Sequence, residues 1–312
     1  MSWLVTGCSG YIGQHVVQLL LLNGFEIIGL DSKPISNSSP LVGKFKSHVG
    51  DICRPELISD VLETYAITGI INLAALKSVE ESIEKPDLYE KVNYGGVKNL
   101  LSRAELAGVQ YFIQSSTAAV YGSSEDGYVD ESHPTAPISP YGTTKLRAED
   151  ALKQAESRGN LRTTSLRYFN VIGSSRPEFK DASGANIVPK VLAAIAKGER
   201  PKIFGDDYPT PDGTCVRDYV HVADIAQAHV LVVQALMDKS LPAAINIGTG
   251  RGYSVRDMVD EILIQKNSLL LPEVLPRRPG DPSMLVARVD RATEVLGFKA
   301  EKGLAEMISS AI

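Results

Sequence analysis

The sequence predicts an α/β fold, a doubly wound parallel sheet with helices on both faces. Three observations lead to this prediction. Short apolar stretches alternate with helical stretches through the first half of the chain. A glycine-rich turn, Gly7-Cys8-Ser9-Gly10-Tyr11-Ile12-Gly13, joins a first strand at Trp3-Leu4-Val5 to a helix. A second strand, at residues 26–30, ends in an acidic residue, Asp31.

The composition limits the classes of function. With 312 residues, 44% of them hydrophobic, the chain is long enough for one large domain or two smaller ones. A net charge of −5 argues against a nucleic-acid-binding protein. Cys8, Cys53 and Cys215 form no paired motif, so we expect neither a disulfide framework nor a metal site. The chain shows no export signal and no apolar stretch near the ~20 residues that span a bilayer, so we expect a cytoplasmic protein without membrane contact.

The glycine-rich turn predicts a site for a dinucleotide. Glycines let the backbone approach a pyrophosphate closely, and the first amides of the following helix donate hydrogen bonds to it. Asp31 lies 18 residues after Gly13, near the position where an acid accepts a hydrogen bond from the adenosine ribose. An acid there favours NAD over NADP, because it repels a 2′-phosphate. The alternative is a tight turn that only requires glycines.

Further strands and helices follow in alternation. We expect strands at 45–49, 70–73, 109–114 and 163–166, and helices at 55–65, 83–107 and 141–157. Ligands of such sheets bind at the carboxyl ends of the strands. Two groups just past a strand are therefore candidates: Asp51, and the hydroxyl cluster Ser115-Ser116-Thr117. Asp51 is suited to bind the adenine amino group, or alternatively to cap the helix that begins near Pro55.

A tyrosine and a lysine four residues apart, Tyr141 and Lys145, are the candidate catalytic pair. On a helix, residues at this spacing share one face, so the ammonium group is expected beside the phenol, where it would lower the pKa of Tyr141. A second such pair, Tyr94 and Lys98, lies inside a predicted helix and is better explained by packing, with Tyr94 facing other side chains or a partner subunit. Tyr141 instead begins its helix after the strand that ends in Thr117, so we favour the first pair.

The alternation weakens beyond residue 172, and we place a domain boundary there. The first domain covers 1–172 and the second 173–312, with about 214–248 returning to the sheet through a helix at 223–237 and a strand at 244–247. Residues 204–222 are rich in glycine, proline and aspartate, which is typical of a functional loop. Arg278 and Asp281 suit phosphate and sugar-diol binding, respectively, or else a solvated surface loop.

These motifs resemble the extended short-chain dehydrogenase/reductases and, within them, the UDP-glucose 4-epimerases. The glycine turn and the Tyr141–Lys145 pair are typical of the superfamily. Three further stretches resemble the epimerases: Ala75 to Val79, Leu166 to Asn170, and above all Tyr208 to Val222. The resemblance covers essentially the whole chain and implies a Rossmann-type first domain with a smaller C-terminal α/β domain that binds the substrate.

The resemblance also implies a reaction. An NAD-dependent epimerase inverts C4 of a UDP-hexose, UDP-glucose or UDP-galactose, through a transient 4-keto sugar. Tyr141 takes the proton of the 4-hydroxyl, Lys145 binds the nicotinamide ribose and lowers the pKa of Tyr141, and Thr117 binds the reacting oxygen. The residues implied to hold NAD are Gly7, Gly10, Tyr11, Ile12, Gly13, Asp31, Asp51, Ile52, Ala74, Lys77, Asn93, Ser115, Tyr141, Lys145 and Tyr168. Those implied to hold the UDP-sugar are Lys77, Thr117, Tyr141, Asn170, Asn186, Ile187, Phe204, Arg217, Arg278, Asp281 and Leu285.

Several alternatives stay open. The resemblance implies that Leu285 occupies the position that gates the sugar pocket, and leucine there leaves open whether N-acetylated sugars are accepted. A UDP-N-acetylhexosamine or UDP-pentose 4-epimerase is therefore an alternative. A nucleotide-sugar dehydratase would need an Asp-Glu pair after the threonine, where this chain has Ala118-Ala119, and a reductase would release its cofactor. Val92 stands where some relatives have an NAD-binding asparagine. The family pattern further implies a homodimer that pairs helices 83–107 and 141–157.

Overall fold

The computed structural model describes residues 1–124, 126–159, 161–181, 183–184, 186–278 and 280–312. Pro279, which lies between Arg278 and Asp281, is outside the described residues. Within the described ranges, no helix is long and apolar enough to cross a membrane. The same residues contain no group of three or more His, Cys, Asp or Glu side chains placed to hold a metal ion.

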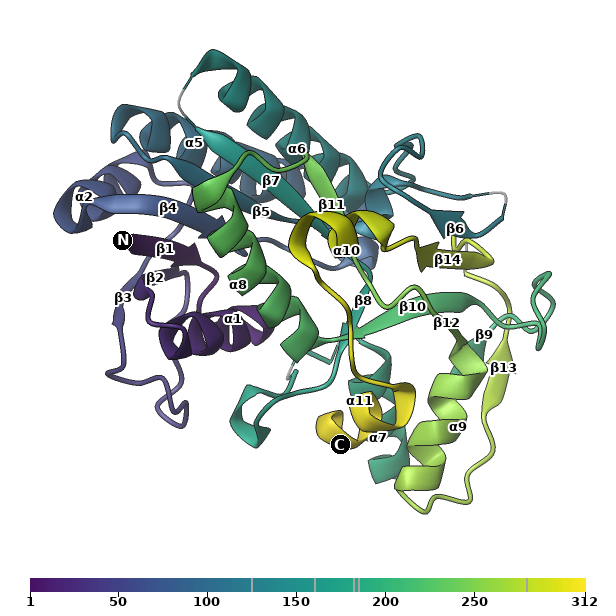
Figure 1. Ribbon diagram of the computed structural model, residues 1–312. Coiled ribbons are helices and arrows are strands. Elements are labelled where there is room, and N and C mark those ends of the chain that lie inside the picture. Colours follow the sequence, from purple (N-terminus) through teal and green to yellow (C-terminus); the bar gives the residue numbers. More distant parts are fainter. Residues whose placement is uncertain (125, 160, 182, 185, 279) are drawn as a thin grey trace.

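A seven-stranded sheet forms the centre of the larger part of the molecule (Figure 1). Its strand order is β11-β7-β5-β4-β1-β2-β3, and all neighbouring strands are parallel. The predicted doubly wound parallel sheet is therefore confirmed. The strands are β1 (Ser2–Thr6), β2 (Glu26–Asp31), β3 (Lys46–Val49), β4 (Ile67–Asn72), β5 (Tyr111–Thr117), β7 (Arg162–Tyr168) and β11 (Ala244–Ile247).

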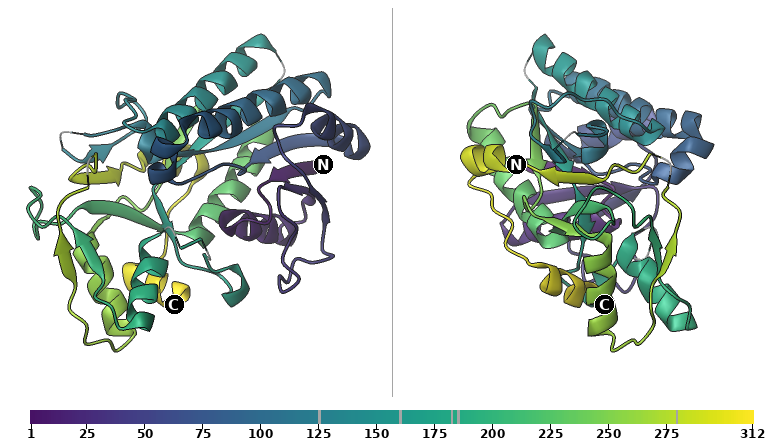
Figure 2. Two further views of the ribbon diagram at one scale, coloured as in Figure 1. Left: turned by 180° about the vertical axis from the view of Figure 1, so that it is seen from behind. Right: turned by 90° about the vertical axis from the view of Figure 1, so that its right-hand side faces the viewer.

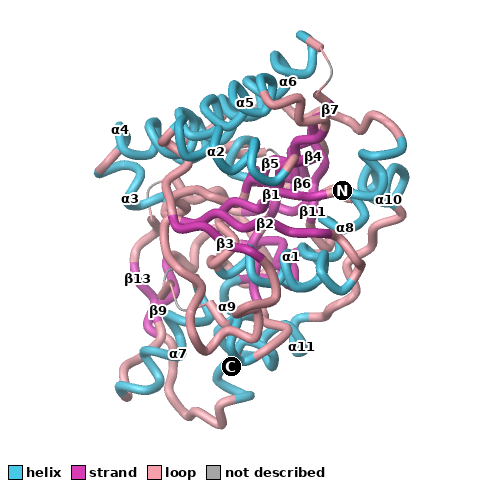
Figure 3. Tube along the Cα trace, turned by 90° about the vertical axis from the view of Figure 1, so that its left-hand side faces the viewer, coloured by secondary structure: helices cyan, strands magenta, loops and turns pink. Residues whose placement is uncertain are grey.

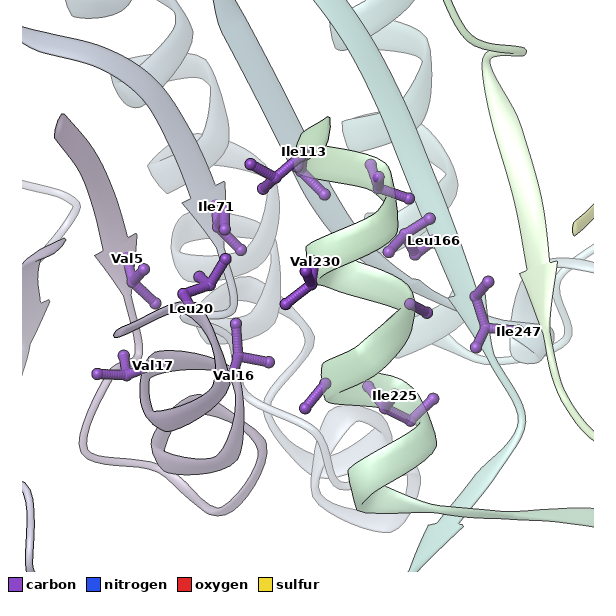
Figure 4. Close-up of a cluster of buried hydrophobic side chains, with 14 of the residues drawn as sticks. Val5, Val16, Val17, Leu20, Ile71, Ile113, Leu166, Ile225, Val230 and Ile247 are labelled. Atoms are coloured by element: carbon purple, nitrogen blue, oxygen red, sulfur yellow. The ribbon is translucent and has the colours of Figure 1, made fainter. Parts of the chain in front are cut away.

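Helices cover both faces of this sheet, as Figure 3 shows. Successive residues of a strand point to opposite faces, so Leu4 packs into one apolar core and Val5 into another. The core around Val5 lies under α1 (Tyr11–Leu22) and α8 (Val222–Asp238), and Figure 4 shows its side chains. The core around Leu4 lies under three helices, α2 (Pro55–Tyr65), α5 (Gly96–Leu106) and α6 (Pro140–Arg158).

The helix predicted at 83–107 is divided into four segments: α3 (Val79–Glu84), α4 (Pro86–Tyr89), a π-helical segment η1 (Glu90–Gly95) and α5. Lys85 separates the first two with an extended φ of −130°. The cause is Pro86, which disfavours a helical conformation in the residue before it. The other predicted helices, 55–65 and 141–157, are continuous.

A smaller part of the molecule contains a second sheet in which β10 (Val216–His221) is the central strand. We predicted this segment as part of a loop, and the structure shows a strand. Around β10 lie β12 (Gly252–Ser254), β14 (Met284–Ala287), β8 (Asn170–Ile172) and, next to β14, β6 (Tyr128–Val129). A separate parallel pair is formed by β9 (Lys202–Phe204) and β13 (Glu273–Leu275).

Helices α7 (Ile187–Lys197), α9 (Val255–Gln265) and α11 (Leu304–Ala311) bury a third apolar core beside these strands. The C-terminus lies at this end of the molecule, far from α5 and α6 (Figure 2). Helix α10 (Asp290–Leu296) packs on α8 and β11. Strand β11 pairs with β7, so the chain returns to the large sheet at residues 244–247. The domain boundary at residue 172 stays a prediction.

Candidate active site

The glycine-rich turn lies at the carboxyl end of β1, against the ends of the neighbouring strands. Gly7 has a φ of +71° and donates its N–H to the Leu30 carbonyl oxygen at 2.8 Å. A Cβ added to Gly13 would lie 2.0 Å from the Gly7 carbonyl oxygen, so only glycine lets α1 begin this close to the turn. Gly10 precedes α1 without a side-chain cap, so backbone amides alone line the start of the helix. This cradle fits a pyrophosphate, and so fits NAD.

Asp31 lies beside the turn, as predicted. One of its carboxylate oxygens accepts a hydrogen bond from the Ser9 N–H at 2.9 Å and the other accepts from the Lys33 N–H at 3.0 Å. Asp51 is exposed and accepts from the Cys53 N–H at 2.9 Å. The N-cap of α2 is Arg54, so the alternative role of Asp51 as that cap is wrong. Ile52 beside it is buried in the core around Leu4.

The loop after β4 is fixed by Asn93. Its side-chain oxygen accepts from the Leu76 N–H at 2.8 Å, and its amide donates to the Leu76 carbonyl oxygen at 2.9 Å. Ala74, in the same loop, donates its N–H to Thr6 Oγ at 3.3 Å. Asn93 is 1% exposed, so the structure shows it as the support of this loop. Its predicted contact with NAD stays a prediction.

Thr117 and Tyr141 come together at the end of β5. Ser139 caps α6 by accepting a hydrogen bond from the Gly142 N–H at 3.1 Å, and Pro140 takes the first helical position. Tyr141 therefore lies in the first turn of α6, where its hydroxyl interacts with the Thr117 side chain. A Cβ on Gly142 would lie 2.6 Å from the Ala119 carbonyl oxygen, so this glycine permits the close approach of α6 to the residues after Thr117.

Lys145 is buried on the same face of α6. Its ammonium group donates to the Ser115 carbonyl oxygen at 2.9 Å, with Ser115 Oγ at 3.4 Å. Burial lowers the pKa of Lys145 to about 8, although the Glu149 carboxylate counteracts it. Ser115, Thr117, Tyr141 and Lys145 thus form one cluster, as the sequence predicted.

The sequence predicted that Lys145 lowers the pKa of Tyr141. In the structure, the net effect of the protein's own groups is to raise that pKa. Burial raises the pKa of Tyr141, and the interaction with Thr117 offsets only part of that rise. The reason is that Lys145 directs its ammonium group to the backbone of β5. The helical spacing correctly predicted a shared face, but tertiary hydrogen bonding determined where the charge lies.

Tyr168, at the end of β7, is buried next to Tyr141. Its hydroxyl lies 2.8 Å from His229 Nε2 on α8, and His229 Nδ1 lies 2.8 Å from the Ile225 carbonyl oxygen. The carbonyl accepts from Nδ1, so Nε2 accepts from Tyr168. Burial holds the pKa of Tyr168 well above its ordinary value and lowers that of His229 to about 4.

Asp181 connects three of the predicted ligand-binding residues and was not predicted itself. It accepts from Asn186 Nδ2 at 2.5 Å and lies 3.6 Å from the Lys77 ammonium group. Lys77 also lies 6.0 Å from the centre of the Tyr11 ring, and the Tyr11 hydroxyl donates to the Gly173 carbonyl oxygen at 2.6 Å. The turn, the loop after β4 and the start of α7 at Ile187 therefore meet on one side of the site.

The second group of predicted substrate residues meets on the smaller sheet. Arg217 of β10 lies 3.6 Å from Asp281 and pairs in register with Leu285 of β14. The Arg278 guanidinium lies 3.9 Å from the centre of the Phe204 ring. Leu285 is 9% exposed and packs in the apolar cluster that contains Ala118 and Phe169, which follow Thr117 and Tyr168. Asn170, the first residue of β8, is exposed.

The second tyrosine–lysine pair lies apart from this cluster. Tyr94 is in η1, and its ring packs 4.0 Å from the Arg147 guanidinium of α6. Lys98 is exposed, with its ammonium group 5.6 Å from the same ring. The packing role predicted for Tyr94 is therefore found within this chain.

Comparison with known proteins agrees with this geometry. A family model, the NAD dependent epimerase/dehydratase family, matches residues 3–248. The UDP-glucose 4-epimerase of Rhizobium leguminosarum bv. trifolii is 38% identical over 316 residues, covering 99% of this chain and 95% of that protein.

Solved structures are similar over the same length. A UDP-glucose 4-epimerase from Brucella ovis in complex with NAD has a TM-score of 0.93 at 36% identity, covering 99% of this chain and 97% of that one. One from Bifidobacterium longum in complex with NAD+ and UDP has a TM-score of 0.90 at 35% identity, covering 100% and 97%. The chain therefore belongs to the NAD dependent epimerase/dehydratase family, and within it resembles UDP-glucose 4-epimerases over its whole length.

Proposed function

We propose that this protein is an NAD-dependent epimerase that inverts C4 of a UDP-hexose, interconverting UDP-glucose and UDP-galactose. The observation that carries the proposal is the cluster of Thr117 and Tyr141 beside the buried Lys145, at the same edge of the sheet as the glycine-rich turn. The names of the similar proteins, and the NAD and UDP bound in their structures, support it.

The backbone amides of the turn hold the pyrophosphate of NAD, and Asp31 binds the adenosine ribose. The carboxylate of Asp31 already accepts two backbone N–H groups, so it is held in place for that contact. NAD, when bound there, would supply the hydride chemistry at C4 of the sugar. Lys145 donates to the ribose hydroxyls, and Tyr168 packs beside the reacting centre.

Tyr141 acts as the acid–base group. It removes the proton of the 4-hydroxyl as C4 is oxidised, and it returns that proton when the 4-keto sugar is reduced. The Thr117 hydroxyl binds the sugar 4-oxygen beside the Tyr141 hydroxyl. Because burial raises the pKa of Tyr141, the phenolate forms readily only once a cationic cofactor ring lies beside it.

The UDP portion lies along the smaller sheet. Arg217 and Arg278 offset the diphosphate charge, and Asp281 binds a sugar diol. Arg217 is mostly buried and lies 3.6 Å from Asp281, and Arg278 lies 3.6 Å from Glu80, so carboxylates hold both arginines in place. Ala118 and Ala119 follow Thr117, and neither can assist the loss of water that a dehydratase requires.

We also propose that the protein is a cytoplasmic homodimer of galactose metabolism. Support for the dimer comes from exposed apolar side chains on the elements expected at its interface, Ile83, Leu88 and Leu106. The dimer is tested by sedimentation velocity of the wild type and of Leu106→Glu, a variant that places a charge on this apolar surface. A monomeric wild type would refute the dimer.

Tyr141→Phe tests the reaction itself. We expect NAD and UDP binding to be retained and kcat to fall by about 10²-fold or more, because the phenyl ring cannot transfer the proton. Turnover is measured with UDP-galactose, UDP-N-acetylgalactosamine and a UDP-pentose, with the products separated by chromatography. Tyr94→Phe, at the second tyrosine–lysine pair, is the matched control and should keep wild-type turnover. Unchanged turnover in Tyr141→Phe would refute the role of this residue.

A further inference from the structure

A buried ion pair lies directly behind the catalytic cluster. Glu149 of α6 and Arg167 of β7 are 1% and 3% exposed. Arg167 binds both carboxylate oxygens, with Nε 3.0 Å from Oε1 and Nη2 2.6 Å from Oε2. Ser116 Oγ donates to the same carboxylate at 2.5 Å. Every hydrogen-bonding partner of Glu149 is therefore itself buried.

Each member of this network is next to a residue of the site. Glu149 follows Lys145 by four residues, so it lies one turn along the same face of α6. Ser116 precedes Thr117 in β5, and Arg167 precedes Tyr168 in β7. The network thus joins α6, β5 and β7 at the point where their site residues meet.

The network continues away from the site through neutral groups. Arg167 Nη1 donates to the Tyr121 hydroxyl at 2.9 Å, and Tyr121 donates to Asn246 Oδ1 at 2.6 Å. Asn246 lies in β11, and its Nδ2 donates to the Val129 carbonyl oxygen at 3.0 Å. Both charges of the ion pair are therefore fixed in position by hydrogen bonds from several elements.

A buried ion pair of this kind contributes little net stability to a fold. Moving two charges out of water costs several kcal/mol per ion, and apolar residues of similar volume often serve as well. Stability therefore gives no reason to place a carboxylate at this position rather than a leucine. We propose that Glu149, held by Arg167 and Ser116 one helical turn from Lys145, is a positioning residue that keeps Lys145 charged.

The proposal rests on the function assigned above to Lys145, which acts only as an ammonium ion. The Lys145 ammonium group contacts Ser115 of β5, and the Glu149 carboxylate, itself paired with Arg167, acts on it electrostatically from one turn along α6. Of these, Glu149 supplies the negative charge. Burial lowers the pKa of Lys145 to about 8, and the Glu149 carboxylate is the group that opposes this fall. Without it, the pKa of Lys145 would fall further, toward neutral pH.

The test compares Glu149→Gln with Glu156→Gln. Glu156 lies on the same helix and also binds β7, accepting from the Thr163 N–H at 3.2 Å and from Thr163 Oγ at 3.3 Å, but it is two turns farther from Lys145. With UDP-galactose as substrate, we expect kcat of the Glu149 variant to fall about tenfold or more, with KM within about twofold of the wild type. The alkaline limb of its kcat profile should move to lower pH by about one unit, which corresponds to one unit in the pKa of Lys145. Glu156→Gln should change neither.

A second measurement does not depend on turnover. The ¹³Cε and ¹⁵Nζ NMR signals of Lys145 in the holoenzyme, assigned with Lys145→Arg, give its pKa directly. We expect this pKa to fall in Glu149→Gln and to stay unchanged in Glu156→Gln. If the wild type epimerises none of the UDP-sugars, the proposed function is wrong. If the Lys145 pKa is the same in both variants and the wild type, the positioning role is wrong.

Removal of both charges separates positioning from stability. Glu149→Gln with Arg167→Met leaves no unpaired buried charge, so we expect its melting temperature to recover relative to Glu149→Gln. Its kcat and its Lys145 pKa should remain below those of the wild type. Recovery of kcat together with stability would overturn the proposal. If Glu149→Gln does not fold, Ser116→Ala, which removes one hydrogen bond to the carboxylate, should shift the alkaline limb in the same direction, and an unshifted limb would overturn it.

Discussion

The contact between Gly142 and Ala119 sets how closely Tyr141 approaches Thr117, and Gly142→Ala tests it. The added Cβ would lie 2.6 Å from the Ala119 carbonyl oxygen and 3.0 Å from Pro137 Cβ. An ordinary contact begins at 3.4 Å, so the first turn of α6 must move by about 0.8 Å away from the end of β5.

This displacement gives the expected magnitude. Since a misplacement of about 1 Å can cost 10²-fold in rate, kcat for UDP-galactose should fall by roughly 10- to 100-fold. The effect on stability is smaller, because alanine gains about 1 kcal/mol of helix propensity while overpacking costs about 1–3 kcal/mol. We expect a free energy of unfolding within about 2 kcal/mol of the wild type.

The assay is steady-state epimerisation of UDP-galactose, together with thermal unfolding. Gly95→Ala is the control, because its Cβ would lie 3.7 Å from the Glu90 carbonyl oxygen, which is an ordinary contact. A Gly142→Ala enzyme with kcat within twofold of the wild type would refute the argument that this close approach positions Tyr141.

Three further predictions concern the cofactor, the sugar and pH. Gly13→Ala should reduce the NAD bound after purification by at least tenfold, because its Cβ would lie 2.0 Å from the Gly7 carbonyl oxygen. The bound NAD is measured by absorbance after denaturation of the protein. Full retention of NAD would contradict the proposed pyrophosphate site at the glycine-rich turn. Leu285→Tyr should suppress epimerisation of UDP-N-acetylgalactosamine and spare UDP-galactose, and equal loss on both would count against Leu285 as a gate. Burial lowers the pKa of His15, and that of His221, to about 4, against about 6.5 in an unfolded chain. The folded state then binds fewer protons, so the melting temperature should be highest above about pH 6.5 and should fall between about pH 6.5 and 4. A melting temperature that is constant over this range would show that these histidines are not held neutral by the fold.

The large sheet could be predicted because most of its strands, unlike the exposed edge strand β3, are buried on both faces. Such strands appear in the sequence as short, continuous apolar runs such as those of β1 and β4, and they need no knowledge of their neighbours to be identified. The smaller sheet could not be predicted in this way. Strand β6 has two residues and β8 three, which is too short for any periodicity, and β10 follows a segment rich in glycine and proline.

Some features of the candidate site could likewise be predicted from the sequence, and others could not. Tyr141 and Lys145 could be identified because helical spacing places them on one face. The raised pKa of Tyr141 could not, since it depends on burial and on a backbone acceptor from another element. Asp181 lies in a polar loop, far along the chain from Lys77, and no local pattern marks it. Glu149 could have been found, because it continues the spacing of four residues from Tyr141 and Lys145.

Helix α8 has a consequence for how the protein is made. It covers one face of β5 and β7, and its buried side chains belong to the same core as theirs. Yet α8 begins at Val222, more than fifty residues after β7 ends at Tyr168. At about 5–20 residues per second, a ribosome leaves this apolar face uncovered for roughly 3–10 seconds. The nascent chain therefore exposes this apolar face during that interval, and a fragment that ends at residue 172 keeps the face exposed permanently.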